Sequence, residues 1–141
     1  MKKIIILNGP NLNLLGEREK SQYGTFTLND IEKKCKDYGE ENGISVSLYQ
    51  SNIEGEIVEK IQLSRNNQNG LIINAGGYTH TSVSIGDAIA AISTPVIEVH
   101  ISNVYAREDF RHQSFMAKHC KGVIAGFGME SYRMAIQSIL V

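Results

Sequence analysis

The sequence has few of the residues that restrict a fold or mark a compartment. Its 141 residues include no tryptophan, two prolines and two cysteines, Cys35 and Cys120. Neither cysteine stands in a CxxC or CxxxxH pattern, so we expect both thiols to pack in the interior of a protein from a reducing compartment. The apolar run before Asn8 is too short for the core of a signal peptide. Together these features predict a cytoplasmic protein.

An excess of either charge is also absent. The chain carries 14 basic and 15 acidic residues, for a net charge of -1. This balance leaves no electrostatic footprint for nucleic acid or for an anionic membrane surface, so we expect neither as a partner. A chain of this length can bury about two-thirds of its unfolded surface without disulfides or metals. We therefore expect a single catalytic domain over residues 1–141.

What the sequence does contain is a regular alternation of apolar runs and amphipathic segments. The apolar runs predict strands at 3–7, 44–49 and 70–73, a fourth that starts at Pro95, and a fifth at 121–125. Strands that alternate with helices imply right-handed crossovers and a parallel sheet. The prediction is an α/β protein with a flavodoxin-like three-layer fold, whose five-stranded parallel sheet has the order 2-1-3-4-5.

Local signals place the helices between these strands. The first helix begins at Thr27, with an acidic residue three positions later, and ends at Asn42-Gly43. Ser51 and Glu54 form a Ser-x-x-Glu pattern, which predicts a capping box at the start of the second helix. A closing helix is expected over 129–141. The residues expected to face inward on the four helices are Leu28, Ile31, Cys35, Tyr38, Ile57, Val58, Ile61, Ile85, Ile89, Ile92, Tyr132, Ala135, Ile136 and Ile139.

The strand that starts at Pro95 is polar on one face. Period-two geometry separates three apolar from three polar residues, namely Ile97, Val99 and Ile101 from Glu98, His100 and Ser102. The carboxylate of Glu98 can accept a ring N–H of His100, which fixes the tautomer and orientation of a general acid or base. The same spacing also fits a buried pair without any chemistry.

Polar clusters follow three of the predicted strands. They lie at 8–23, 74–80 and 100–111, after the first, third and fourth strands. Ligands of open α/β sheets bind beyond the carboxyl ends of the strands, and these three strands are neighbours in the predicted order. We therefore expect one crevice, whose polar side chains suit a small anionic substrate rich in hydroxyl groups. The segment 8–24 has no sustained period and fits either a hinged lid or disorder.

Familiar alternatives for this fold fit less well. The chain lacks the acidic pair of a phosphoacceptor, the Ser- and Thr-rich loop of a flavin site, and both GxGxxG and GxxxxGK[ST]. A metal site from His80, Asp87 and His100 has no ligand pair at a usual spacing, and Asp87 alone is more typical of a solvated helix carboxylate. A hydrolase built on Ser102 lacks a nucleophile elbow. These residues favour a site without a metal.

Several ordered motifs along the chain are shared with one enzyme family. They are Asn8-Gly-Pro-Asn-Leu-Asn-Leu-Leu-Gly-x-Arg18 with Tyr23-Gly24, Asn74-x-Gly-Gly-Tyr-Thr-His80-Thr-Ser, Asp87, and Glu98-Val-His100-Ile-Ser-Asn with Arg107-Glu-x-Phe-Arg111. In these motifs and their spacing, the sequence resembles the type II 3-dehydroquinate dehydratases over nearly its whole length.

The resemblance implies a hydro-lyase of the shikimate pathway of aromatic amino acid biosynthesis. The reaction is an anti elimination of water from 3-dehydroquinate to 3-dehydroshikimate through an enolate, without metal or cofactor. Tyr23 would be the base that removes a proton next to the ketone. Since a phenol ordinarily loses its proton near pH 10, Arg18 and Arg107 would favour the phenolate by charge proximity.

The resemblance also implies roles for the remaining residues. A water held near Asn11 would stabilise the enolate, and His100, oriented by Glu98, would protonate the leaving hydroxyl. The substrate carboxylate would bind Asn74 and the backbone amides of Ile101 and Ser102, and the ring hydroxyls would bind His80 and Arg111.

A neighbouring subunit is implied as well. In the family, Asp87 reaches the site of another chain, and the assembly is a homododecamer, a tetramer of trimers. A different class stays open beside the enzyme: a non-catalytic module of the same fold that binds a small anion in the same crevice.

Overall fold

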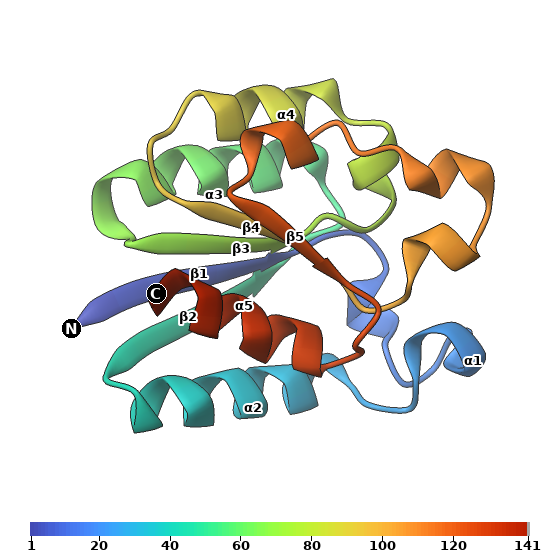
Figure 1. The fold of residues 1–141 in the computed structure, drawn as a ribbon, viewed down its shortest axis with the longest axis horizontal. Coiled ribbons are helices and arrows are strands. Elements are labelled where there is room, and N and C mark those ends of the chain that lie inside the picture. Colours follow the sequence, from blue (N-terminus) through green and yellow to red (C-terminus); the bar gives the residue numbers. More distant parts are fainter. Residues whose placement is uncertain (141) are drawn as a thin grey trace.

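A parallel sheet of five strands runs through the middle of the molecule in the computed structural model, which describes residues 1–140 (Figure 1). The strand order is β2-β1-β3-β4-β5, and every neighbouring pair is parallel. The predicted α/β fold and strand order are therefore confirmed. The strands are β1 Lys2–Asn8, β2 Ile44–Gln50, β3 Gly70–Asn74, β4 Val96–His100 and β5 Gly122–Ala125.

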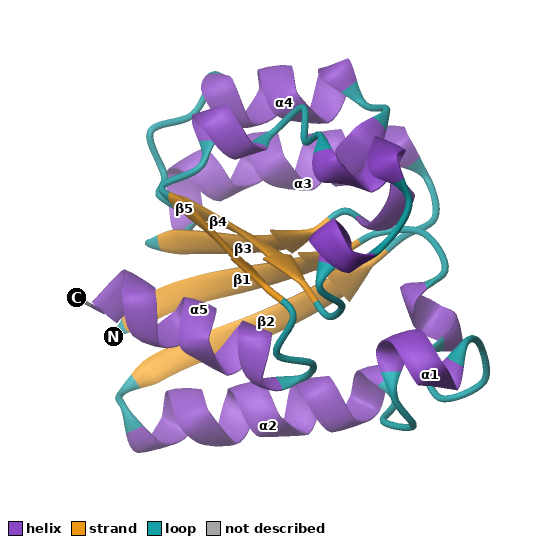
Figure 2. Ribbon diagram, turned by 45° about the vertical axis from the view of Figure 1, so that its right-hand side comes forward, coloured by secondary structure: helices purple, strands orange, loops and turns teal. Residues whose placement is uncertain are grey.

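Helices cover both faces of the sheet, as Figure 2 shows. One face carries α2 (Leu28–Glu41) and α5 (Glu130–Leu140), and the other carries α3 (Glu54–Asn67) and α4 (Val83–Ala90). The short helix α1 (Lys20–Tyr23) lies beyond the end of the sheet. Five 3-10 helices complete the order: η1 Leu12–Leu14, η2 Gly76–His80, η3 Val104–Ala106, η4 Asp109–His112 and η5 Ala117–His119.

Two apolar cores separate the sheet from its helices. On β4, Ile97 and Val99 join the core under α2 and α5, whereas Val96 joins the core under α3 and α4. This alternation is the period-two pattern expected for the strand. Both cysteines pack against these cores, as predicted, and burial raises the pKa of each thiol to about 12.

The two predicted helix caps have different outcomes. At α2, the Thr27 hydroxyl accepts from the Asp30 N–H and the Asp30 carboxylate accepts from the Thr27 N–H, so the predicted cap is confirmed. The capping box predicted for Ser51 and Glu54 is wrong, because Ile53 is the N-cap of α3. The Ser51 hydroxyl instead accepts from the Ile53 N–H at 2.9 Å and donates to Glu56, which closes a turn ahead of the helix.

Other boundaries differ by one or two residues. The fourth strand begins at Val96, the fifth at Gly122 and the closing helix at Glu130, while its expected last residue, Val141, lies outside the described residues. The segment 8–24, expected to lack regular structure, contains η1 and α1. Within residues 1–140, the helices are too short or too polar to cross a membrane.

Gly9 sits where the segment after β1 meets the segment after β3. A Cβ at this position would lie 2.4 Å from the carbonyl oxygen of Ala75, and the Gly9 N–H donates to the Asn74 carbonyl at 2.8 Å. Both neighbours are backbone atoms, so they cannot rotate away as a side chain could. The close approach of these two segments therefore requires glycine.

We predict that Gly9→Ala lowers the free energy of unfolding by about 1–3 kcal/mol, because backbone has to shift to admit the methyl group. Urea denaturation measures the change. Gly55→Ala is the matched control, since a Cβ on Gly55 meets no atom within 4 Å; this variant should be unchanged or up to about 1 kcal/mol more stable. Equal stability of Gly9→Ala and the unmodified chain would contradict the packing described.

Candidate active site

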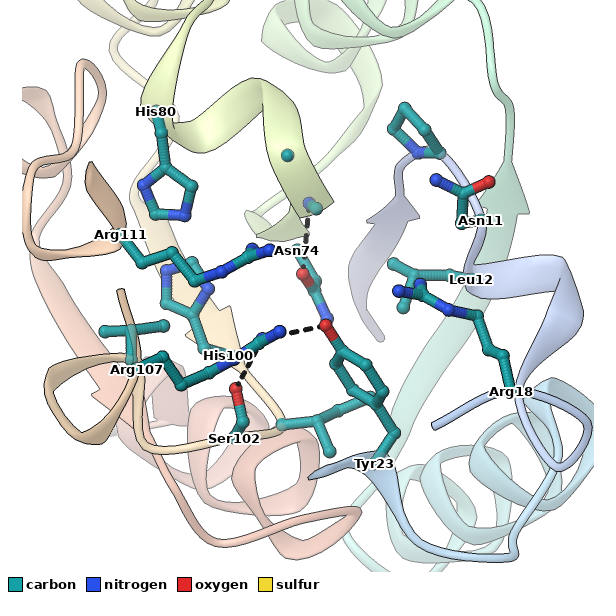
Figure 3. Close-up of a pocket in the computed structure, with 15 residues that line it drawn as sticks. Asn11, Leu12, Arg18, Tyr23, Asn74, His80, His100, Ser102, Arg107 and Arg111 are labelled. Atoms are coloured by element: carbon teal, nitrogen blue, oxygen red, sulfur yellow. Dashed lines mark hydrogen bonds between the residues drawn. The ribbon is translucent and has the colours of Figure 1, made fainter. Parts of the chain in front are cut away.

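A cavity of about 120 Å³ opens at the carboxyl ends of β1, β3 and β4. Its position confirms the crevice expected from the three polar clusters. Figure 3 shows side chains from segments far apart in the sequence converging on it. Ten of the twelve residues predicted for the site line this cavity: Asn11, Arg18, Tyr23, Asn74, His80, His100, Ile101, Ser102, Arg107 and Arg111.

The predicted Glu98–His100 pair lies at the end of β4. His100 Nε2 is 2.5 Å from Glu98 Oε2, and the two residues are only 6% and 2% exposed. Since a carboxylate can only accept, the ring proton of this bond is on Nε2. Glu98 therefore fixes the tautomer of His100 and leaves Nδ1 as the ring nitrogen that can exchange a proton with a ligand.

Tyr23 of α1 is held between two arginines. Arg107 Nη1 donates to the phenol oxygen at 2.8 Å and approaches the Ser102 hydroxyl at 3.3 Å. The guanidinium carbon of Arg18 lies 4.7 Å from the centre of the Tyr23 ring, and that of Arg107 lies 5.2 Å from it. Figure 3 shows Arg18 and Arg107 on opposite sides of the phenol. The segment predicted as a possible lid thus places a phenol oxygen beside a cation.

Asn74, at the end of β3, is oriented by a buried tyrosine of α5. The Asn74 side-chain amide donates to the Tyr132 phenol oxygen at 2.9 Å, and the Tyr132 hydroxyl donates to Asn8 Oδ1 at 2.6 Å. Burial raises the pKa of Tyr132 above its ordinary value, so its phenol keeps its proton and remains a donor. Asn74 Oδ1 also accepts from the Gly76 N–H at 3.2 Å, which leaves one amide N–H for a ligand.

Asn11 stands at the opposite wall in a left-handed backbone conformation, with φ of 69°. Its N–H donates to Asn52 Oδ1 at 3.0 Å, and the Gln50 amide donates to the same oxygen at 3.1 Å. Gln50 also donates to the Gly9 carbonyl at 3.1 Å. These bonds hold the backbone of the turn after β1, so the Asn11 side chain is presented to the cavity.

His80 and Arg111 line the side of the cavity next to His100. His80 Nδ1 donates to the Gln113 carbonyl at 2.7 Å, which leaves Nε2 as an acceptor. Burial is the main cause that lowers the pKa of His80, so its ring is neutral near pH 7. Arg111 Nε donates to Glu108 at 2.9 Å and holds the pKa of that carboxyl below its usual value.

Several known proteins are similar to this chain in both sequence and fold. The family model for class II dehydroquinases matches residues 2–140. The chain belongs to this family. It is 54% identical to the 3-dehydroquinate dehydratases of Nitratiruptor sp., over 95% of this chain and 86% of that one, and of Rhizobium johnstonii, over 96% and 94%. The solved type II dehydroquinase of Butyrivibrio crossotus has a TM-score of 0.97 at 46% identity, covering 99% of this chain and 98% of that one.

Two predicted residues of this class II dehydroquinase do not line the cavity. Glu98 lies behind His100 and acts on the cavity only through that ring. Asp87 is an exposed residue of α4 and lies outside the cavity, whereas His80 belongs to η2 and lines it. Within residues 1–140, no cluster of three or more His, Cys, Asp or Glu side chains could hold a metal ion.

Some residues of this dehydroquinase site were not predicted. The walls also contain Pro10, Leu12, Gly76, Gly77 and Val104. The first four lie inside the motifs that carry the resemblance, so their position in those motifs was the feature of the sequence that could have indicated them. Tyr132 was expected only as an apolar contact of the closing helix, because helical spacing shows which face is buried and not where a hydroxyl is directed.

Proposed function

We propose that this class II dehydroquinase dehydrates 3-dehydroquinate to 3-dehydroshikimate with Tyr23 as the base and His100 as the acid. The reaction is a hydro-lyase step of the shikimate pathway, and the single domain over residues 1–141 carries it. The observation that supports these roles is the placement of a phenol oxygen and an imidazole, each with a fixed charged partner, in one cavity.

Removal of the substrate proton starts at Tyr23. The Tyr23 phenolate takes the proton from the carbon next to the ketone, and the electron pair of that C–H bond forms the enolate. Arg107 donates directly to the phenol oxygen, and Arg18 stacks on the ring. Two cations at these positions stabilise a phenolate more than a neutral phenol, which supports Tyr23 as the base.

Loss of water follows at His100. The protonated ring gives the Nδ1 proton to the leaving hydroxyl as its C–O bond breaks, and the enolate electrons form the double bond of the product. Glu98 accepts the other ring proton throughout, so the imidazolium and the imidazole keep one orientation. Asn11 holds the water that donates to the enolate oxygen, which stabilises the charge that develops there.

Binding of the substrate uses the other polar groups of the cavity. The free amide N–H of Asn74 and the backbone amides of Ile101 and Ser102 bind the carboxylate, and His80 and Arg111 bind the ring hydroxyls. The bonds of Asn74 to Tyr132 and of His80 to Gln113 support this assignment, because each fixes which atom is left for the substrate.

The first experiment is the ultraviolet absorbance of purified, chelator-treated protein mixed with 3-dehydroquinate, since only the product has a conjugated enone. We expect a steady rise in absorbance, and Tyr23→Phe should abolish it while substrate affinity stays within about tenfold, because only the base is lost. Tyr105→Phe is the matched control, as Tyr105 is 67% exposed and lies outside the cavity.

Either of two results would remove part of this proposal. Near-normal turnover by Tyr23→Phe would dismiss Tyr23 as the base. Binding of 3-dehydroquinate by the folded, unmodified protein without any turnover would instead identify a small-anion binding module.

The pH dependence of kcat tests the two arginines. The acid limb reports the protonation of the base, so removing a cation from the phenol should move this limb to higher pH. We expect Arg18→Gln to shift it upward by about one pH unit or less and Arg18→Lys, which keeps the charge, to shift it less. An acid limb that is the same in both variants and in the unmodified enzyme would contradict the effect of Arg18 on Tyr23.

We further propose that the enzyme is a cytoplasmic homododecamer, a tetramer of trimers in which Asp87 completes the site of a neighbouring chain. The exposed position of Asp87 outside its own cavity supports this role. The edge strand β5 and its surroundings also expose apolar side chains, with Val123 45%, Tyr105 67% and Phe127 63% exposed. The two free thiols support a reducing compartment.

Sedimentation velocity should therefore show a species of twelve chains. Asp87→Ala and Tyr23→Phe should each lose activity, and assemblies formed from a mixture of the two inactive variants should regain part of it, because some sites then combine an intact Tyr23 with an intact neighbouring Asp87. A fully active monomer would contradict the shared site.

A further inference from the structure

The hydroxyl of Ser114 lies behind the Glu98–His100 pair. Ser114 Oγ donates to Glu98 Oε1 at 2.7 Å, and it accepts from the backbone N–H groups of Met116 at 3.2 Å and Ala117 at 3.0 Å. Because two donors occupy the lone pairs of the hydroxyl, its single proton is directed to the carboxylate. Ser114 is therefore a donor to Glu98 and not an acceptor from it.

Glu98 accepts in both of its side-chain hydrogen bonds. Oε1 accepts from Ser114 and Oε2 accepts the ring proton of His100, so the two donors compete for the charge of one carboxylate. A donor on one oxygen draws negative charge toward itself and weakens the other oxygen as a partner for a cation. The strength of the bond between Glu98 and His100 thus depends on a third residue outside the cavity.

The same short segment also reaches the second histidine of the cavity. The carbonyl of Gln113, the residue before Ser114, accepts the Nδ1 proton of His80. The rings of His80 and His100 are nearly parallel, at 16°, with centres 6.3 Å apart. Residues 113 and 114 therefore contact His80 directly and His100 through Glu98.

This segment is fixed by its own backbone contacts. The Phe115 N–H donates to the Thr79 carbonyl at 2.9 Å, which joins the segment to η2. A Cβ on Gly86 would lie 2.3 Å from the Phe115 carbonyl oxygen, so α4 packs directly against the segment. Met116, next along the chain, is fully buried. The Ser114 hydroxyl is thus held in place by elements on either side of it.

We infer that Ser114 is a positioning residue for the dehydration, whose hydrogen bond to Glu98 keeps His100 acidic enough to protonate the leaving hydroxyl. The inference rests on the proposed function, in which His100 is the acid. Without the Ser114 donor, more of the carboxylate charge acts on the bond to His100, the imidazolium becomes more stable, and it gives up its proton less readily.

Other titratable and charged groups lie around the pair. They come from η2, the segment after β4, the segment 18–23 and the segment before β5, and they are His80, Arg107, Arg111, Arg18, Tyr23 and Cys120. Within residues 1–140, none of these groups forms a hydrogen bond with the Ser114 hydroxyl. A change at that hydroxyl therefore reaches His100 through Glu98.

Ser114→Thr and Ser114→Val form the matched test, because the two side chains have similar shapes and only threonine has the hydroxyl. We expect Ser114→Val to lower kcat about threefold, to leave KM within about twofold, and to move the basic limb of the kcat profile upward by about 0.5 pH unit, because half a pKa unit changes the rate of proton transfer by at most about that factor. Ser114→Thr should stay near the unmodified enzyme in all three. Ser138→Ala is the control, since the Ser138 hydroxyl donates to its own helix α5 at 2.8 Å.

Turnover of 3-dehydroquinate by the unmodified protein is measured first, so that failure of the proposed function is seen separately. Melting temperatures confirm that each variant is folded, and Ser114→Ala replaces Ser114→Val if the valine variant does not fold. The inference is overturned if the variant without the hydroxyl keeps the kcat and basic limb of the unmodified enzyme. It is also overturned if Ser114→Thr loses as much activity as that variant, because shape and not the hydrogen bond would then matter.

Discussion

The parallel direction of the strands is the constraint on which the site depends. Because β1, β3 and β4 all end at the same edge of the sheet, segments far apart in the sequence start there and meet in one cavity. The register of the strands fixes which residues lie side by side at this edge: Asn8 pairs with Asn74, and Ile73 pairs with Glu98. Antiparallel neighbours would have placed these polar ends on opposite sides of the molecule.

Burial makes each polar group of the site dependent on a partner. Glu98, Asn74 and Tyr132 are almost inaccessible to water, and a buried polar atom without a hydrogen bond costs free energy. Their partners therefore stabilise the fold and also fix which atoms remain for a ligand. Arg107 likewise joins two parts of the site. Its guanidinium contacts the side chain of Tyr23 in α1 and the side chain of Ser102 in the segment after β4.

Local patterns in the sequence were enough to predict the sheet, the helices and the Glu98–His100 pair. The pair lies two residues apart on one strand, so alternation alone shows that the side chains share a face. The cap at Ser51 was predicted wrongly because the same hydroxyl can cap a helix or close a turn, and the choice depends on Glu56. Ser114 and Tyr132 could not be predicted, since they act 16 and 58 residues away from Glu98 and Asn74. Their contacts arise from tertiary packing, for which a single sequence has no periodic signal.

The bond from Tyr132 to Asn8 has a consequence for the order in which the molecule is made. It joins residues 124 positions apart, so the last helix completes a network that the first strand begins. During synthesis, the amide of Asn74 lacks its buried partner until α5 has left the ribosome and docked on the sheet. Contacts of such long sequence separation form late, because the entropy of closing the chain must be overcome first. The Asn74 amide therefore becomes oriented for a ligand only after α5 has docked on the sheet, so the cavity is completed by a contact that forms late in folding.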